Sequence, residues 1–151
     1  MMKILTDKWK DQFAKQQFDL VKSLVETMPE AVMITDAGGE GFDPPILYVN
    51  PAFTALTGYA PEDILGNPPS ILQGPDTERE VLERLKTKLS DGSKFQGRTW
   101  NYRQNGDRFM MEWEIVTFHN AREQPSFYMT IQREAAAESP VNHHESLRAG
   151  A

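Results

Sequence analysis

The 151-residue sequence contains no cysteine. This absence excludes disulfides, thiolate metal sites, cysteine nucleophiles and cysteinyl adducts to a chromophore. Lysine and arginine form no long run and the formal net charge is −6, so the basic footprint that nucleic acid or anionic lipid requires is missing. The opening residues form neither a signal-peptide core nor a span for a bilayer. We therefore expect a cytoplasmic protein that binds neither nucleic acid nor membrane.

The remaining composition is that of one compact domain, with 39% hydrophobic and 10% aromatic residues. From Thr6 to Met28, apolar residues recur at helical spacing, and Pro29 ends the pattern. They form two adjoining stripes, Trp9, Phe13, Leu20, Leu24 and Phe18, Val21, Val25, Met28. One interpretation packs both stripes on the domain. We favour the other, in which the Trp9 stripe contacts a partner helix.

Five later segments have strand character: 31–36, 46–49, 95–103, 108–118 and 126–133. Asn105-Gly106 predicts a tight hairpin between the third and the fourth. Between the second and third strands lie a helix over 52–57 capped by Asn50, a short helix over 61–65, and a longer helix capped by Asp76 or Thr77. The two prolines of the segment 67–69 predict that it lacks regular structure. The sequence predicts an α+β fold, a five-stranded antiparallel sheet with short helices on one face plus an N-terminal amphipathic helix.

Three regions follow from this pattern. We expect residues 1–28 to form an amphipathic dimerisation helix, residues 29–134 to form the domain, and residues 135–151 to form a polar, disordered tail.

Two motifs carry a resemblance to a known family. The run YVNPAFTALTGY over 48–59, followed by PEDILG over 61–66, resembles the start of a PAS domain. The run GNPPSILQGP over 66–75 resembles the signature of the light-sensing LOV branch, in which glycine, any residue, asparagine, cysteine, arginine, phenylalanine, leucine, glutamine and glycine follow in order. The likeness covers about residues 27–134.

The resemblance implies a pocket for flavin mononucleotide, in which blue light drives a bond between the signature cysteine and the flavin. By alignment with that family, Gln73, Asn101 and Gln132 match three polar positions of its pocket. Lys86 falls where the family often has a second phosphate-binding arginine.

Four other pocket positions depart from the family. Pro69 stands at the photoactive-cysteine position, and Ser70 replaces the phosphate-contacting arginine. Met111 replaces a flavin-contacting asparagine, and Thr130 replaces a glycine beneath the ring. A guanidinium holds phosphate through paired charge-assisted hydrogen bonds, and methionine offers no hydrogen bond to a ring edge. We therefore expect no cofactor, and flavin mononucleotide enters only under the alternative given below.

Strand alternation places Phe109, Met111, Trp113 and Ile115 on one inward face. The first interpretation is a pocket filled by these side chains, and the second is a small-ligand cavity. Asn101 and Gln132 have a further alternative, which is to pair with each other or with backbone. Glu112 and Glu114 alternate with the inward residues, so they belong to a solvated face and not to an acid/base pair.

The resemblance, taken with these patterns, implies a non-catalytic sensory or dimerisation domain of the PAS type in signal transduction, whose pocket is filled or binds an unknown small ligand. The alternative is a cysteine-less, LOV-like photoreceptor that works by flavin photoreduction, with Trp100, Tyr102 and Trp113 as electron donors. A third is an adaptor with a filled core. We expect a homodimer through the N-terminal helix and the apolar face of the last strand, Phe127, Met129 and Ile131, with its signal passed to a downstream domain or protein.

Overall fold

The computed structural model describes residues 12–37, 43–92 and 94–136. Its elements follow in the order α2 (Gln12–Val25), β1 (Ala31–Asp36), β2 (Ile46–Val49), α3 (Pro51–Thr57), α4 (Pro61–Ile64), a 3-10 turn η1 (Pro69–Leu72), α5 (Arg79–Ser90), β3 (Phe95–Tyr102), β4 (Arg108–His119) and β5 (Pro125–Glu134). The strands form one antiparallel sheet in the order β2-β1-β5-β4-β3. The predicted fold is confirmed.

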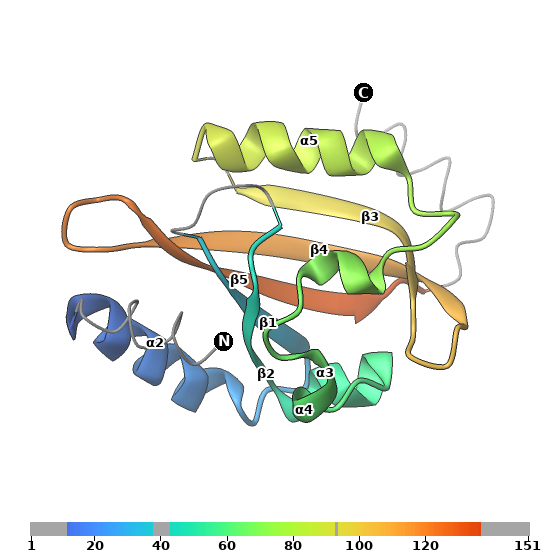
Figure 1. Cartoon of the computed structure of the whole chain (residues 1–151), viewed down its shortest axis with the longest axis horizontal. Helices are drawn as coiled ribbons and strands as arrows, with labels where there is room; N and C mark the ends of the chain where they lie inside the picture. The colour runs from blue at the N-terminus through green and yellow to red at the C-terminus, as the bar shows by residue number, and fades with distance from the viewer. Residues whose placement is uncertain (1–11, 38–42, 93, 137–151) are drawn as a thin grey trace.

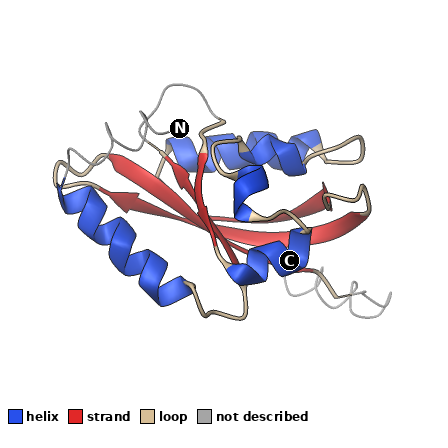
Figure 2. Ribbon diagram, turned by 60° about the horizontal axis from the view of Figure 1, so that its bottom comes forward, coloured by secondary structure: helices blue, strands red, loops and turns tan. Residues whose placement is uncertain are grey.

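Helices lie on both faces of the sheet (Figures 1 and 2). The inner face carries α3, α4, η1 and α5, whose apolar side chains pack on β1, β3 and β4. The outer face carries α2, which crosses β1, β2 and β5. Because side chains alternate along a strand, each strand contributes to both layers. Gln132 and Trp113 belong to the inner face, and Phe127 belongs to the outer one.

Asn50 joins the two layers and begins α3, as its predicted role as a cap requires. Its Oδ1 accepts hydrogen bonds from the backbone N–H of Phe53 at 3.0 Å and of Val32 at 2.8 Å. Its Nδ2 donates to the carbonyls of Val25 and Glu30, both at 2.9 Å. The side chain is buried. This one amide therefore fixes the end of α2, the start of β1 and the start of α3 together.

Two local predictions between α4 and β3 are wrong. The residue that begins α5 is Glu78, whose side chain makes no capping hydrogen bond, and not Asp76 or Thr77. Thr77 Oγ1 instead donates to the Trp100 carbonyl at 2.7 Å, so its hydroxyl ties the loop to β3. Of the segment 67–69, expected to lack regular structure, residues 67 and 68 do lack it, but Pro69 is the first residue of η1, where a missing N–H breaks no helical hydrogen bond.

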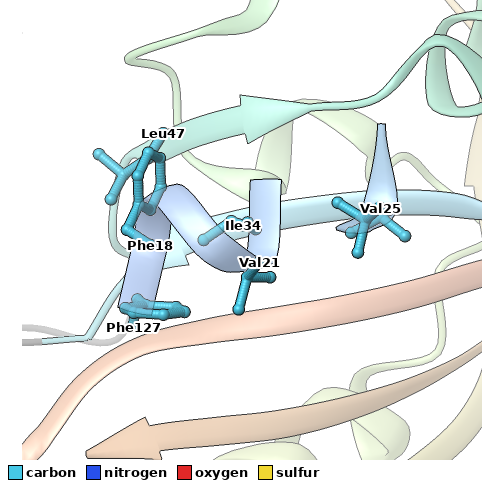
Figure 3. Close-up of a cluster of buried hydrophobic side chains, with 7 residues drawn as sticks. Phe18, Val21, Val25, Ile34, Leu47 and Phe127 are labelled. Atoms are coloured by element: carbon cyan, nitrogen blue, oxygen red, sulfur yellow. The ribbon is translucent and has the colours of Figure 1, made fainter. Parts of the chain in front are cut away.

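The outer-face cluster is built from one stripe of α2 and the strands beneath it (Figure 3). Phe18, Val21 and Val25 pack against a set of strand residues, namely Val32, Ile34, Leu47 and Phe127. The rings of Phe18 and Phe127 meet edge to face with centroids 6.0 Å apart. The sequence predicted a dimer interface at Phe127, but the chain's own helix α2 covers it, so that prediction is wrong for this residue.

The other stripe of α2 is exposed where the structure describes it. Leu20 and Leu24 are 62% and 64% exposed, and Phe13 is 45% exposed. Trp9 lies outside the described residues. The interpretation that packs both stripes on the domain is therefore wrong for Leu20 and Leu24. No helix in the described ranges is both long and apolar enough to cross a bilayer.

Candidate functional site

An interior cavity of about 90 Å³ lies between the inner face of the sheet and the segment from η1 to α5. One buried water needs about 10–15 Å³, so the space holds roughly six to nine waters or a ligand with about that many heavy atoms. Most of its wall is apolar, from Met33, Leu72, Leu82, Leu85, Leu89, Met111, Trp113 and Ile115. An apolar cavity with a few convergent polar groups is the usual form of a small-ligand site.

The structure places most of the residues singled out from the sequence around this one cavity. Its lining includes Pro69, Gln73, Asn101, Met111 and Gln132, and also Thr130. Lys86 is outside the lining. It is exposed on α5, with its Nζ 3.9 Å from Glu83 Oε1.

Gln132 is the polar group whose hydrogen bonding is incomplete. Its side chain is 1% exposed, and its Oε1 accepts no hydrogen bond within the described part of the chain. Its Nε2 lies 4.0 Å from the sulfur of Met33, which is a weak acceptor. A buried acceptor without a donor costs about 1–3 kcal/mol. For Gln132, the alternative of pairing with Asn101 or with backbone is therefore not what the structure shows.

Another polar side chain of the cavity wall, that of Thr99, is satisfied. Thr99 Oγ1 accepts a hydrogen bond from the backbone N–H of Glu78 at 2.8 Å, which ties the start of α5 to β3. Burial raises the pKa of Tyr128, which also lines the cavity, so its phenol stays protonated at neutral pH. Gln132 therefore stands out as an acceptor held ready for a donor.

Protein side chains already occupy much of the inner layer. Met111 and Trp113 are each 5% exposed, and the rings of Phe95 and Trp113 are 5.4 Å apart. The predicted inward face of β4 is confirmed. Glu112 and Glu114 lie on the opposite face, where Arg133 pairs with both, as their predicted solvated position requires.

The rim of the cavity is acidic. Asp43, which precedes β2, lines the cavity, and Ser70 Oγ donates a hydrogen bond to its Oδ2 at 2.6 Å. Neither lysine nor arginine is among the described lining residues. Sequence reasoning missed Asp43, because it lies in a long irregular connection and meets Ser70 only through the fold.

Comparison with known proteins gives one family. The family described as PAS fold matches residues 19–133. A blue-light photoreceptor of Listeria monocytogenes serovar 1/2a is 33% identical over 125 residues, which is 83% of this chain and 48% of that protein. Phototropin-2 of Oryza sativa subsp. japonica is 31% identical over 97 residues, 64% of this chain and 10% of that protein. The chain thus spans about half or less of the length of these relatives.

Solved structures agree. A light-oxygen-voltage domain from work with a flavin analogue superimposes with a TM-score of 0.74 at 26% identity, covering 88% of this chain and 96% of that one. The light state of the Aureochrome1 LOV domain, a blue-light photoreceptor, gives a TM-score of 0.65 at 29% identity, covering 78% and 89%.

Flavin mononucleotide, which the LOV resemblance implies, would meet two different environments in this cavity. At the inner end, Gln132 offers a free buried acceptor to a ring N–H. At the rim, a phosphate with nearly two negative charges would meet the carboxylate of Asp43 and none of the cations that bind phosphate. The residues present suit a ring edge and do not suit the phosphate.

Proposed function

The chain belongs to the PAS family, and from that premise we propose that it is a sensory module in signal transduction whose interior cavity receives a small ligand. The observation that carries this proposal is the buried, partnerless Oε1 of Gln132 at the wall of an apolar cavity. A domain with a purely structural core gains nothing from an unmet acceptor there. A ligand donor at Gln132 would change the hydrogen bonding of β5, the central strand of the sheet.

We propose a non-catalytic role for the same cavity. Two carboxylates of β4, Glu112 and Glu114, lie on the face away from it and pair with arginines, and Asp43 at its rim is exposed and held by Ser70. General acid/base work requires a group within hydrogen-bond reach of the substrate, and these two are on the wrong side of the sheet.

The ligand is tested by native mass spectrometry of the full chain as purified, with the denatured supernatant analysed for released small molecules. We expect a bound species in the wild type and its loss in Gln132→Met, which keeps the side chain long and removes the acceptor. Gln104→Met is the matched control, because Gln104 is exposed in the turn between β3 and β4. Identical spectra without a bound species in wild type and both variants would contradict ligand reception.

We further propose that the module acts as a homodimer whose interface includes the exposed stripe of α2. Leu20 and Leu24 leave most of their apolar surface in water, where burial is worth about 25 cal/mol per Å². A second copy of α2 can cover these leucines with its own exposed stripe, so we commit to a second copy as the occupant.

The dimer is tested by light scattering on Leu20→Glu/Leu24→Glu over a range of concentrations. Placing two charges in the interface should remove about 2 kcal/mol or more, which raises the dimer Kd more than tenfold. Ser23→Glu, an exposed position of α2 outside the leucine stripe, should leave Kd unchanged. Equal Kd values for the double variant and the control would rule out this face as the interface.

A second candidate function is a flavin photoreceptor that works without a cysteine. It is favoured by the 33% identity to a blue-light photoreceptor. Absorption spectra of the purified protein separate the candidates. The sensory proposal predicts no flavin band, even after expression with ample riboflavin, whereas a stoichiometric band that blue light bleaches would establish the second candidate. Because Pro69 stands at the photoactive-cysteine position, Pro69→Cys alone should create no photocycle without bound flavin.

A further inference from the structure

We propose that the cavity is selective for a small, uncharged heterocycle of one or two rings whose N–H donates to Gln132, and that it rejects anionic ligands, phosphorylated flavin included. This inference rests on the proposed function, since it assumes that the cavity receives a ligand. It adds the chemical class of that ligand, and each part of the class follows from a different part of the wall.

The inner end sets the hydrogen-bond requirement. Gln132 is held between β1 and β4, opposite Ala31 and Trp113 in the strand register, so its amide cannot swing to solvent. Its Nε2 is turned to the Met33 sulfur, and its Oε1 is left as a bare acceptor. An acceptor in a dry site discriminates strongly against a ligand that lacks the matching donor. The ligand therefore carries an N–H.

The middle of the cavity sets size and shape. Leu82, Leu85 and Leu89 line it from α5, and Met111, Trp113 and Ile115 line it from β4. An apolar ring between these two sets keeps both walls dry, and a volume of about 90 Å³ has room for one or two rings. A tricyclic flavin with a phosphorylated chain would require the inner layer to move.

The rim sets the charge. Asp43 keeps its carboxylate at the cavity edge through the 2.6 Å hydrogen bond from Ser70, and the described lining offers no cation to offset it. An anion entering here would meet a like charge with no lysine or arginine of the described lining beside it to offset the repulsion. A neutral ligand meets no such barrier.

The test is calorimetric titration of the full chain with three probes of nearly one shape. Indole has the N–H, benzothiophene lacks it, and indole-3-carboxylate adds an anion. We expect indole to bind at least tenfold more tightly than either of the others. Equal affinity for indole and benzothiophene would overturn the donor requirement, and equal affinity for indole and its carboxylate would overturn the charge selection.

Two variants assign the selectivity to residues. Gln132→Met should bring the ratio of indole to benzothiophene affinity close to one, and Asp43→Asn should raise the affinity for indole-3-carboxylate several-fold relative to that for indole. Asp76→Asn is the control for charge, since Asp76 pairs with Arg108 outside the cavity lining. Circular dichroism checks that each variant is folded. If Asp76→Asn has the effect of Asp43→Asn, the rim is not the source of the selection.

Riboflavin and flavin mononucleotide form a larger probe pair that differs in the phosphate alone. Tighter binding of the phosphorylated form would overturn the inference and support the photoreceptor candidate. If no probe binds while native spectra show a species that Gln132→Met removes, the inference falls and the proposed function stands. If neither a probe nor a native ligand binds, both fall.

Discussion

The two faces of the sheet differ in how tightly their side chains pack. On the outer face, Phe127 is fully buried under α2, its ring stacks on Phe118 with centroids 4.7 Å apart, and the charges farther along the sheet pair with one another. On the inner face, the same strands border a cavity of about 90 Å³ and an amide oxygen without a donor. The same backbone supports both, so the difference comes from side chains alone.

The difference separates stability from recognition. Close packing stabilises the fold, and the outer face has it in the cluster under α2. A cavity and an acceptor without a donor lower the stability of the fold, and such features persist where ligand binding offsets that loss of stability. We therefore expect substitutions on the outer face to act mainly on unfolding, and those on the inner face to act mainly on binding.

The largest expected effect is on the outer face. Phe127→Ala should lower the free energy of unfolding by about 3–5 kcal/mol, because it empties a fully enclosed aromatic site between α2 and the sheet. Urea denaturation followed by circular dichroism measures it.

Met111→Ala on the inner face is the matched test. Its side chain is also buried, yet it borders space that is already open, so its removal should lower the unfolding free energy less, by about 2–3 kcal/mol. If Met111→Ala destabilises the protein as much as Phe127→Ala, the two faces are equally well packed and the comparison fails.

Within the inner face, two substitutions should change the unfolding free energy by smaller amounts and in opposite directions. Gln132→Met removes the partnerless acceptor, so without ligand it should raise the unfolding free energy by about 1–2 kcal/mol. Thr99→Val removes the hydroxyl that accepts a hydrogen bond from the N–H of Glu78 and leaves that N–H unpaired. It should therefore lower the unfolding free energy by about 1 kcal/mol. The same urea titrations measure both. Destabilisation by Gln132→Met would show that its amide is satisfied in solution.

Local signals in the sequence predicted the elements well. Asn50-Pro51 fixes the start of α3, and Asn105-Gly106 gives the tight β3–β4 turn, with Gly106 at a φ of 94° where glycine is favoured. Each of these depends on neighbours a few residues apart. The periodicity of α2 also predicted which stripe would be buried and which leucines would stay exposed.

The site was predictable as a set of positions and not as a set of contacts. Strand alternation and the LOV likeness brought Asn101, Met111 and Gln132 to one face, but neither says that Gln132 lacks a donor. That depends on how side chains from β1, β4 and β5 settle against one another. The Asp43–Ser70 hydrogen bond joins residues 27 positions apart in the sequence, and no pattern in either segment predicts it. The predicted cap of α5 was wrong for the same reason, because Thr77 Oγ1 donates its hydrogen bond to the Trp100 carbonyl in β3.

The smallest expected effect concerns the outer ion pairs. Arg133 lies on β5 with its Nη2 3.0 Å from Glu114 Oε1 and its Nη1 3.9 Å from Glu112 Oε2, and all three side chains are partly exposed. Exposed pairs contribute about 0–1 kcal/mol, and about 1 M salt shortens the screening length to about 3 Å. Arg133→Gln should therefore lower the unfolding free energy by at most about 1 kcal/mol at low salt, and the difference should vanish in about 1 M NaCl. Arg122→Gln, in the exposed β4–β5 turn, controls for loss of one positive charge from a protein of net charge −6. A deficit that survives high salt would mean that Arg133 acts through packing of its aliphatic stem, and the charged end of the outer face would then be part of its core.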